Sequence, residues 1–279
     1  MVLCWLACAV MLALMAGWAN KPAPRAPFDF SGADIAVIGG SLTMYGIPAS
    51  DDGKVALLAD GRSHVRVGLS DPLPEEIEDL VEQALDGKVQ TILLEVRPFI
   101  FVLRNQQDRQ LCNDLLCESL LGIRRLRNNF RDWYRGLLGR PSNYAMRLKR
   151  GTEFPIGLDE PFTVQEPLEQ VYPVIFLERE PSQRMQDLVR RATEQETRII
   201  LYQPPRSPMA QAYLELGQNA EISNRSAYYA RRLQLPLFDP DIEWSNDDFV
   251  DRAHLGASGR AKLVAALRQW WADTGMSAS

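Results

Sequence analysis

Short apolar segments recur along the chain, and longer segments with apolar residues at helical spacing separate them. Short segments that are continuously apolar, or that alternate apolar with polar residues, are typical of β-strands. The sequence therefore predicts five strands, at 34–38, 64–68, 91–96, 197–202 and 235–239. The composition of 91–96 favours a strand buried on both faces, whereas the proline inside 235–239 is typical of an edge strand.

Helical spacing predicts helices at 74–85, 183–194, 209–217 and 257–272. The first of them begins with an acidic turn, which favours a helix N-terminus. Strands that alternate with helices over this length predict an α/β fold with a mainly parallel sheet and helices on both faces. In such sheets ligands bind beyond the carboxyl ends of the strands.

The segment 105–170 departs from this alternation and predicts an insertion between the third and fourth strands. It begins with a helical pattern and becomes strongly basic between Arg124 and Arg150, with aromatic residues interleaved. Arginines with aromatic residues suit an anionic glycan or lipid headgroups. A solvated amphipathic helix has the same composition, so both interpretations stay open.

The segment 1–19 is uncharged and mostly apolar, with a length between that of a signal-peptide core and that of a short membrane-spanning helix. Small residues at Gly17 and Ala19 suit cleavage by signal peptidase, whereas no Lys or Arg precedes the segment. A cleaved signal peptide and an N-terminal membrane anchor therefore both stay open. The proline-rich segment 20–31 predicts an extended linker. The sequence thus predicts an exported, periplasmic or extracytoplasmic protein with one α/β domain over 32–275.

The composition narrows the function further. Of the 279 residues, 46% are hydrophobic and 24% are charged, as in ordinary globular proteins. The net charge of −5 does not favour nucleic-acid binding. The chain has only two histidines, His64 and His254, which excludes a His-rich metal site and leaves two candidates for histidine acid–base chemistry. Cys112 and Cys117 would form a disulfide in an oxidising compartment only if the chain bends between them, and two half-buried thiols are the alternative.

Ser41 follows the first predicted strand directly, after Gly39 and Gly40. Two glycines let the backbone turn sharply where the strand ends. The serine hydroxyl would then lie at the open end of the sheet, beside a helix N-terminus whose N–H groups can bind an anion. An ordinary tight turn has the same pattern, so this serine alone does not establish a catalytic site.

Asp251 and His254 lie near the other end of the chain, directly before the last predicted helix. A spacing of three residues in a tight loop can place a carboxylate against an imidazole. The carboxylate then fixes the histidine tautomer, and the other ring nitrogen is left to accept a proton from a serine. A capping histidine and a loop carboxylate are the alternatives for the two residues taken singly.

Together, the Gly-x-Ser-x-Thr pattern at 39–43 and the Asp-x-x-His-Leu-x-x-x-Gly pattern at 251–259 resemble the first and last blocks of the SGNH (GDSL-like) hydrolases. The resemblance implies a flavodoxin-like three-layer α/β/α sandwich and a Ser–His–Asp triad that acts on acyl esters without a cofactor or metal. By position, Ser41 would be the nucleophile, His254 the general base and Asp251 its orienting carboxylate. The α/β-hydrolase fold needs a Gly-x-Ser-x-Gly turn, which the chain lacks.

The middle blocks depart from the family pattern. Gly68 occupies the place of the oxyanion glycine after the second strand. After the third strand, where the family has Gly-x-Asn-Asp, the chain has 95–99, Glu-Val-Arg-Pro-Phe, and so lacks the asparagine donor. Arg97 is a tentative substitute for that donor, and pairing of Arg97 with Glu95 or another carboxylate is the alternative. Loss of one oxyanion donor typically costs two to three orders of magnitude in rate.

Such divergence resembles the membrane-associated branch of the family that modifies envelope polysaccharides. We therefore expect an exported SGNH-like serine enzyme that hydrolyses or transfers an O-acyl group on an envelope or extracellular polysaccharide. The expected acyl group is acetyl. The expected partners are a carbohydrate or acyl-ester substrate, the membrane surface and a polysaccharide-synthesis machinery, and no nucleic acid. The alternative is a non-catalytic accessory protein of a glycan synthesis or export machine that uses a degenerate SGNH fold for binding.

Overall fold

The computed structural model describes the residues 28–48, 57–58, 61–69, 72–103, 134–135, 138, 174–177, 180–213, 218–251 and 253–275. By its internal contacts the chain divides into two units, Met1–Pro27 with Asn105–Arg147 and Phe28–Arg104 with Leu148–Ser279. The fold that follows is that of the second unit. The segment 1–19, the cysteines Cys112 and Cys117, and the predicted insertion apart from 134–135 and 138 lie outside the described residues.

A sheet of five parallel strands forms the centre of the fold, in the order β2-β1-β3-β6-β7. The strands are β1 (Ile35–Gly39), β2 (His64–Gly68), β3 (Thr91–Glu95), β6 (Arg198–Tyr202) and β7 (Leu237–Phe238). Each coincides with a predicted strand, and β7 lies at an edge of the sheet as its proline predicted. Numbered along the chain, this is the 2-1-3-4-5 order of flavodoxin-like folds, in which ligands bind where the order reverses, between β1 and β3. The predicted fold class is therefore confirmed.

The strands form because their residues suit burial on both faces. Every residue of β1 and β3 is buried, as the parallel arrangement requires. The register pairs Gly39 of β1 with Gly68 of β2, and Glu95 of β3 with Tyr202 of β6. The carboxyl ends of these four strands therefore meet at one edge of the sheet.

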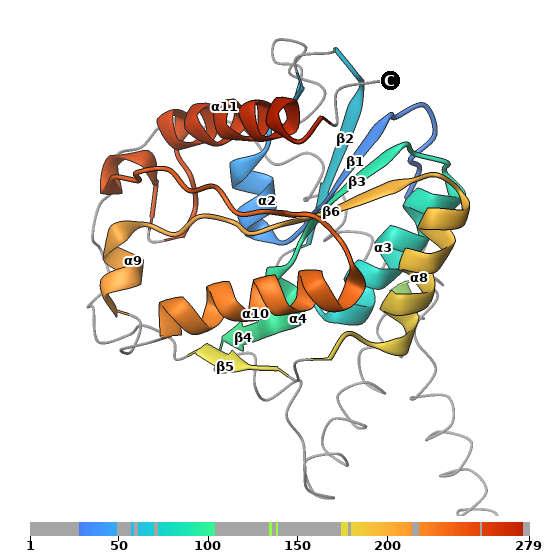
Figure 1. Ribbon diagram of the computed structural model, residues 1–279, viewed down its shortest axis with the longest axis horizontal. Helices are drawn as coiled ribbons and strands as arrows, with labels where there is room; N and C mark the ends of the chain where they lie inside the picture. The colour runs from blue at the N-terminus through green and yellow to red at the C-terminus, as the bar shows by residue number, and fades with distance from the viewer. Residues whose placement is uncertain are drawn as a thin grey trace, which may run out of the picture. The chain divides into compact units, whose positions relative to one another are not determined.

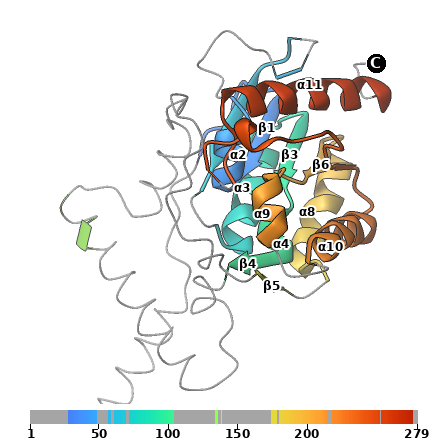
Figure 2. The same ribbon diagram turned by 90° about the vertical axis from the view of Figure 1, so that its left-hand side faces the viewer.

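Helices cover both faces (Figures 1 and 2). One face carries α2 (Ser41–Gly46) and α11 (Ala257–Asp273), and the other carries α3 (Pro74–Asp86), α8 (Gln183–Glu194) and α10 (Gln218–Leu233). The core under α11 joins apolar residues of β1, β3, β6 and β7 to one side of that helix. Its members include Val37, Leu93, Ile200, Tyr202, Phe238, Leu263, Leu267 and Trp271.

Local signals explain where the predicted helices begin. In α3, Pro74 is the first residue and the Glu76 carboxylate accepts a hydrogen bond from the Leu73 N–H at 3.0 Å. In α8, the Ser182 hydroxyl caps the helix by accepting from the Met185 N–H at 3.0 Å. The predicted helices 74–85, 183–194 and 257–272 are thus confirmed to within one residue at each end.

The region after β6 differs from its prediction. A short helix, α9 (Pro208–Tyr213), is followed by the longer α10, which the sequence pattern did not predict. The buried apolar residues of α10 are Ile222, Tyr229, Ala230 and Leu233, and the fully buried Ser226 interrupts this row at the centre of the helix. Its hydroxyl donates to Gln203 Oε1 at 2.6 Å and also bonds the Ile222 carbonyl. A polar residue satisfied in this way weakened the helical pattern.

A second, two-stranded sheet lies where the predicted insertion leaves and re-enters the domain. A short helix, α4 (Arg97–Ile100), leads into β4 (Phe101–Leu103), which pairs antiparallel with β5 (Val174–Phe176). Leu103 and Val174 are partners, so the two ends of the intervening segment lie side by side. Within the described ranges, no helix is both long and apolar enough to cross a membrane.

Candidate active site

Ser41 is the first residue of α2, directly after the turn that ends β1. The turn needs glycine because other side chains approach it closely. A Cβ atom at Gly39 would lie 2.1 Å from Thr43 Oγ1 and 2.5 Å from Glu95 Oε2. Ser41 is at the first position of a helix, where the backbone N–H has no partner within the helix.

Glu95 holds this turn from the end of β3. Its side chain is fully buried, and Oε2 accepts hydrogen bonds from the Gly40 N–H at 2.6 Å and the Thr43 hydroxyl at 2.5 Å. A carboxylate at a helix N-terminus is also favoured by the helix dipole. Glu95 was not predicted as a site residue, although a charged residue inside a strand predicted to be buried on both faces was a usable signal.

The other end of α2 is held from β2. The buried Arg66 donates from Nη1 to the carbonyls of Met44 and Ile47, at 2.5 and 2.6 Å. His64 bonds the Pro48 carbonyl through Nε2 at 3.0 Å. Burial lowers the pKa of His64, an effect opposed by the bond to Pro48 and reinforced by the charge of Arg66. His64 is thus a structural residue that is neutral near pH 7, and of the two histidines only His254 lies in the candidate site.

Asp251 and His254 lie in the loop between η3 (Asn246–Asp248) and α11. Asp251 Oδ1 accepts from the N–H groups of Ala253 and His254, at 2.8 and 2.7 Å. Residues at the two ends of the loop also bond each other, because the Val250 N–H donates to the His254 carbonyl at 2.9 Å. Nearly all of these contacts are local, and the Asp251 side chain is 54% exposed.

The structure brings the three predicted catalytic residues together. His254 Nε2 lies 3.0 Å from Ser41 Oγ, and His254 Nδ1 lies 2.6 Å from Asp251 Oδ2. In the tautomer that suits both contacts, the serine hydroxyl donates to Nε2 and the Nδ1–H donates to the carboxylate. Partial burial acts to raise the pKa of Asp251, but the hydrogen bonds and charge of His254 and the bonds to the backbone N–H groups outweigh it, so the pKa is lowered. The carboxylate therefore stays ionised near neutral pH.

Tyr45 supports the imidazole from α2. Its ring centroid lies 4.3 Å from that of His254, with the rings tilted by 43°. Partial burial, followed by the negative charge of Asp251, raises the pKa of Tyr45. Tyr45 was not predicted as a site residue. It is four residues after Ser41, however, and residues at this spacing lie on the same side of a helix.

Gly68 and Arg97 are the two residues predicted to bind the oxyanion, and neither has a hydrogen bond to a triad residue. A Cβ atom on Gly68 would lie 2.2 Å from Met44 Cγ and 3.0 Å from the Gly40 carbonyl oxygen, so this glycine lets α2 approach β2. Leu69 donates its N–H to Gly39, and because N–H directions alternate along a strand, the N–H of Gly68 faces away from β1. Its oxyanion role stays a prediction.

Arg97 lies at the start of α4, with its guanidinium 5.5 Å from the centroid of the Phe101 ring. The alternative that Arg97 pairs with Glu95 is wrong, because the bonded oxygen of that carboxylate faces Gly40 and Thr43 and no ion pair joins the two residues. The oxyanion role of Arg97 also stays a prediction.

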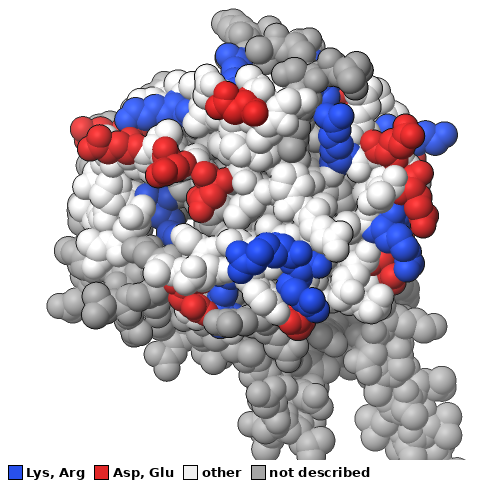
Figure 3. Space-filling model, viewed as in Figure 1, with Lys and Arg blue, Asp and Glu red and all other residues white. Residues whose placement is uncertain are grey.

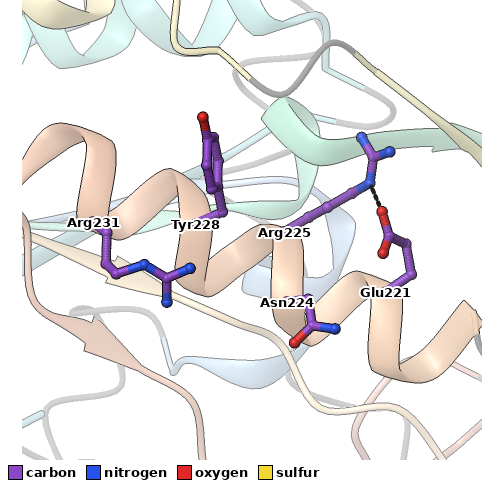
Figure 4. Close-up of a pocket in the computed structure, with 5 residues that line it drawn as sticks. All are labelled: Glu221, Asn224, Arg225, Tyr228 and Arg231. Atoms are coloured by element: carbon purple, nitrogen blue, oxygen red, sulfur yellow. Dashed lines mark hydrogen bonds and ion pairs between the residues drawn. The ribbon is translucent and has the colours of Figure 1, made fainter.

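A separate pocket of about 260 Å³ lies along α10 (Figure 4). It is lined by Glu221, Asn224, Arg225, Tyr228 and Arg231. Arg225 bonds Glu221 and the Leu177 carbonyl, at 2.5 and 2.7 Å, and so ties α10 to the end of β5. None of the triad residues lines this pocket. On the described part of the face in Figure 3, acidic and basic residues occur in small mixed groups, in keeping with the mild net charge.

A Ser–His–Asp triad at the carboxyl edge of a flavodoxin-like sheet is the arrangement of a serine-hydrolase site.

No family model and no curated protein matches the chain. Solved structures similar to it include a protein described as an acylhydrolase from Bacteroides fragilis, at 12% identity and a TM-score of 0.43, over 92% of this chain and 98% of that chain. A GDSL-like lipase from Bacteroides thetaiotaomicron is 10% identical with a TM-score of 0.43, over 93% and 98%. A catalytic mutant of an acetylxylan esterase from Geobacillus stearothermophilus is 12% identical with a TM-score of 0.42, over 88% and 95%.

Proposed function

We propose that this protein is an SGNH-type serine esterase or O-acyltransferase. The observation that carries the proposal is the hydrogen-bonded series from Ser41 Oγ through His254 to Asp251, with Nε2 and Oγ at 3.0 Å. This distance is within the range that a general base needs to remove a proton. A binding platform without catalysis has no need to keep the three side chains in this geometry, so the accessory-protein alternative is disfavoured.

In the proposed reaction, Ser41 Oγ attacks the carbonyl carbon of the acyl ester and its proton passes to His254 Nε2. The Ser41 N–H stabilises the oxyanion, with Gly68 and Arg97 as the further predicted donors. The imidazolium, stabilised by Asp251, returns the proton to the leaving alcohol oxygen as the ester bond breaks. Water or a second hydroxyl then attacks the acyl-serine, which yields hydrolysis or transfer.

The finer features of the proposal rest on sequence. The acyl group is proposed to be acetyl and its carrier an envelope or extracellular polysaccharide, which the resemblance to the polysaccharide-modifying branch supports. Export, with 1–19 as signal peptide or anchor, is supported by the apolar and uncharged character of that segment. The membrane surface and a polysaccharide-synthesis machinery remain proposed partners.

The test is hydrolysis of p-nitrophenyl acetate by the full chain in detergent, with Ser41→Ala and His254→Ala variants. Loss of the nucleophile is expected to reduce kcat/KM by about four to six orders of magnitude. Brief incubation should also leave one acetyl group on the peptide that contains Ser41, detected by mass spectrometry.

Ser31→Ala is the matched control, because it removes a hydroxyl from an exposed serine outside the triad. It should retain full activity and a wild-type melting temperature. Activity that survives in a folded Ser41→Ala protein would contradict the serine mechanism. A folded wild-type chain that releases no acetyl group from any ester would support the accessory-protein alternative.

A further inference from the structure

Two arginines lie at the same edge of the sheet as Ser41. Arg97 follows β3 after one residue, and Arg206 lies in the segment that leaves β6. The two strands are neighbours, and β3 is also the neighbour of β1, whose end carries Ser41. The reversal of strand order between β1 and β3 is where flavodoxin-like sheets bind ligands. Both arginines are therefore placed where a substrate of Ser41 would extend.

Among the residues that the structure describes, no hydrogen bond or ion pair joins either guanidinium to a carboxylate, although Asp239 attracts Arg206 over a longer distance. The Arg97 guanidinium lies over the Phe101 ring, 5.5 Å from the ring centroid. Nε of Arg206 is buried and has no hydrogen-bond partner. Other arginines of the domain form ion pairs with carboxylates. Arg184, for example, bonds Asp79 and Glu82.

The two charges also affect each other. Burial lowers the pKa of Arg206 to about 10, the attraction of Asp239 opposes this, and the repulsion of Arg97 adds to it. At this value Arg206 stays charged at neutral pH. Asp239 directly follows β7, so charged residues follow three adjacent strands. The carboxylate of Glu95, at the end of β3, is occupied by Gly40 and Thr43.

Holding a half-buried guanidinium near a second cation costs free energy when no carboxylate bonds either of them. Charge-assisted bonds from guanidinium groups to a carboxylate offset that cost and are among the stronger bonds in proteins. The two guanidinium groups are thus suited to bind an anion that arrives with the substrate.

We propose that Arg97 and Arg206 bind a carboxylate on the molecule that carries the acyl ester, so that the preferred substrate is an acylated acidic sugar. The inference rests on the proposed esterase function and names its substrate class. It gives Arg97 a role different from that of an oxyanion donor. An oxyanion donor acts on every ester through kcat, whereas a carboxylate-binding residue acts on acidic substrates through KM.

The experiment compares two substrates that differ only in charge, a monoacetylated methyl glucuronoside and its methyl ester, with the full chain in detergent. The wild-type protein should have the lower KM for the acid. Arg97→Gln and Arg206→Gln should each raise that KM about 10- to 100-fold, the effect of losing charge-assisted hydrogen bonds. In Arg206→Gln, turnover of the methyl ester and of p-nitrophenyl acetate should change less than about 3-fold. Arg206→Lys should rescue only in part, because lysine keeps the charge but not the planar fork.

Arg190→Gln is the matched control. It removes the same charge from an exposed residue of α8 that pairs with Asp187, and it should leave both KM values unchanged. Melting temperatures of all variants identify any substitution that unfolds the protein, and Arg97→Gln remains informative if Arg206→Gln does not fold.

The failures of the two proposals are distinguishable. Equal KM values for acid and methyl ester, with turnover that depends on Ser41, would overturn the carboxylate site and leave the esterase intact. An equal fall in kcat for all esters in Arg97→Gln would assign Arg97 to the oxyanion instead. If no ester is turned over, the carboxylate site can still be tested by calorimetry, which measures binding of methyl glucuronoside and of its methyl ester to the full chain. Binding of the acid alone, lost in Arg206→Gln, supports the site, and equal or absent binding overturns it. Stronger competition by inorganic phosphate than by acetate would replace the carboxylate with a phosphate.

Discussion

The two halves of the triad are supported in different ways. Ser41 is held by residues from strands far away in sequence, since Glu95 and Arg66 bond the two ends of the helix that it begins. Both of these side chains are buried. Asp251 and His254, by contrast, are held mainly by bonds within their own loop, and the Asp251 side chain is 54% exposed.

Because the two halves are held in different ways, substitutions in them should affect the free energy of unfolding and the activity differently. A buried carboxylate that satisfies two donors contributes to the folded state, because its removal leaves those donors without partners. An exposed loop carboxylate contributes little to folding but fixes the tautomer of the base. Substitutions on the nucleophile side should therefore lower stability as well as activity, and those on the base side should lower activity alone.

Among substitutions of the residues that support Ser41 and His254, Asp251→Asn should have the largest effect on rate. The amide keeps the shape of the side chain but favours the wrong histidine tautomer, so kcat for p-nitrophenyl acetate should fall about 10³- to 10⁴-fold. The free energy of unfolding in urea should change by less than about 0.5 kcal/mol, as for most exposed positions. A loss of stability above about 2 kcal/mol would show that the loop is also structural and would remove the contrast.

The largest expected effect on stability comes from Glu95→Ala. The substitution leaves the Gly40 N–H and the Thr43 hydroxyl buried without an acceptor, and the free energy of unfolding should fall by about 2–5 kcal/mol. Glu95→Gln keeps one acceptor oxygen and should lose less than half as much. Urea unfolding measures both, and kcat at a temperature where both variants are folded measures the effect on Ser41. Wild-type stability in Glu95→Ala would refute the role given to this residue.

Gly39→Ala and Gly256→Ala extend the contrast to the backbone. At Gly39 a Cβ atom would lie 2.1 Å from Thr43 Oγ1, whereas at Gly256 its nearest neighbour is Val250 Cγ1 at 3.4 Å. Overpacking should therefore cost Gly39→Ala about 1–3 kcal/mol of stability. The same change at Gly256, in the loop region of the base, should cost less than about 1 kcal/mol. Equal melting temperatures for the two variants would contradict the close packing of the first turn.

The smallest effect concerns pH. Burial lowers the pKa of His64 below its ordinary value of 6.5, so between the two values the unfolded chain binds more protons than the folded one. Stability should therefore fall as the pH decreases below about 6.5, and the loss should be complete below the folded pKa. In His64→Gln, which can still bond the Pro48 carbonyl, urea unfolding between pH 7 and pH 5 should show a shallower decline. An unchanged slope would mean that other groups cause the acid sensitivity.

Part of this architecture follows from the sequence alone. The strands are short apolar segments with clear ends, and Ser41, Asp251 and His254 belong to two short motifs, so both could be predicted. The roles of Glu95 and Arg66 could not be assigned, because they depend on which strands become neighbours and on the register between them. The role of Tyr45 depends on contact with His254, from the other end of the chain. The helix α10 was missed for a related reason, since the partner that satisfies Ser226 comes from the segment after β6.

The antiparallel pairing of Leu103 with Val174 has a consequence for how such a domain can change. The free energy needed to bring the ends of a chain segment together rises only slowly with its length, and here the residues on both sides of 104–173 are joined by a ladder outside the main sheet. Residues 104–173 could therefore be lengthened, shortened or exchanged for a tight hairpin without altering the register of any strand of the main sheet. The junction is a natural place for related chains to gain or lose a whole module while the arrangement of Ser41, Asp251 and His254 is inherited intact.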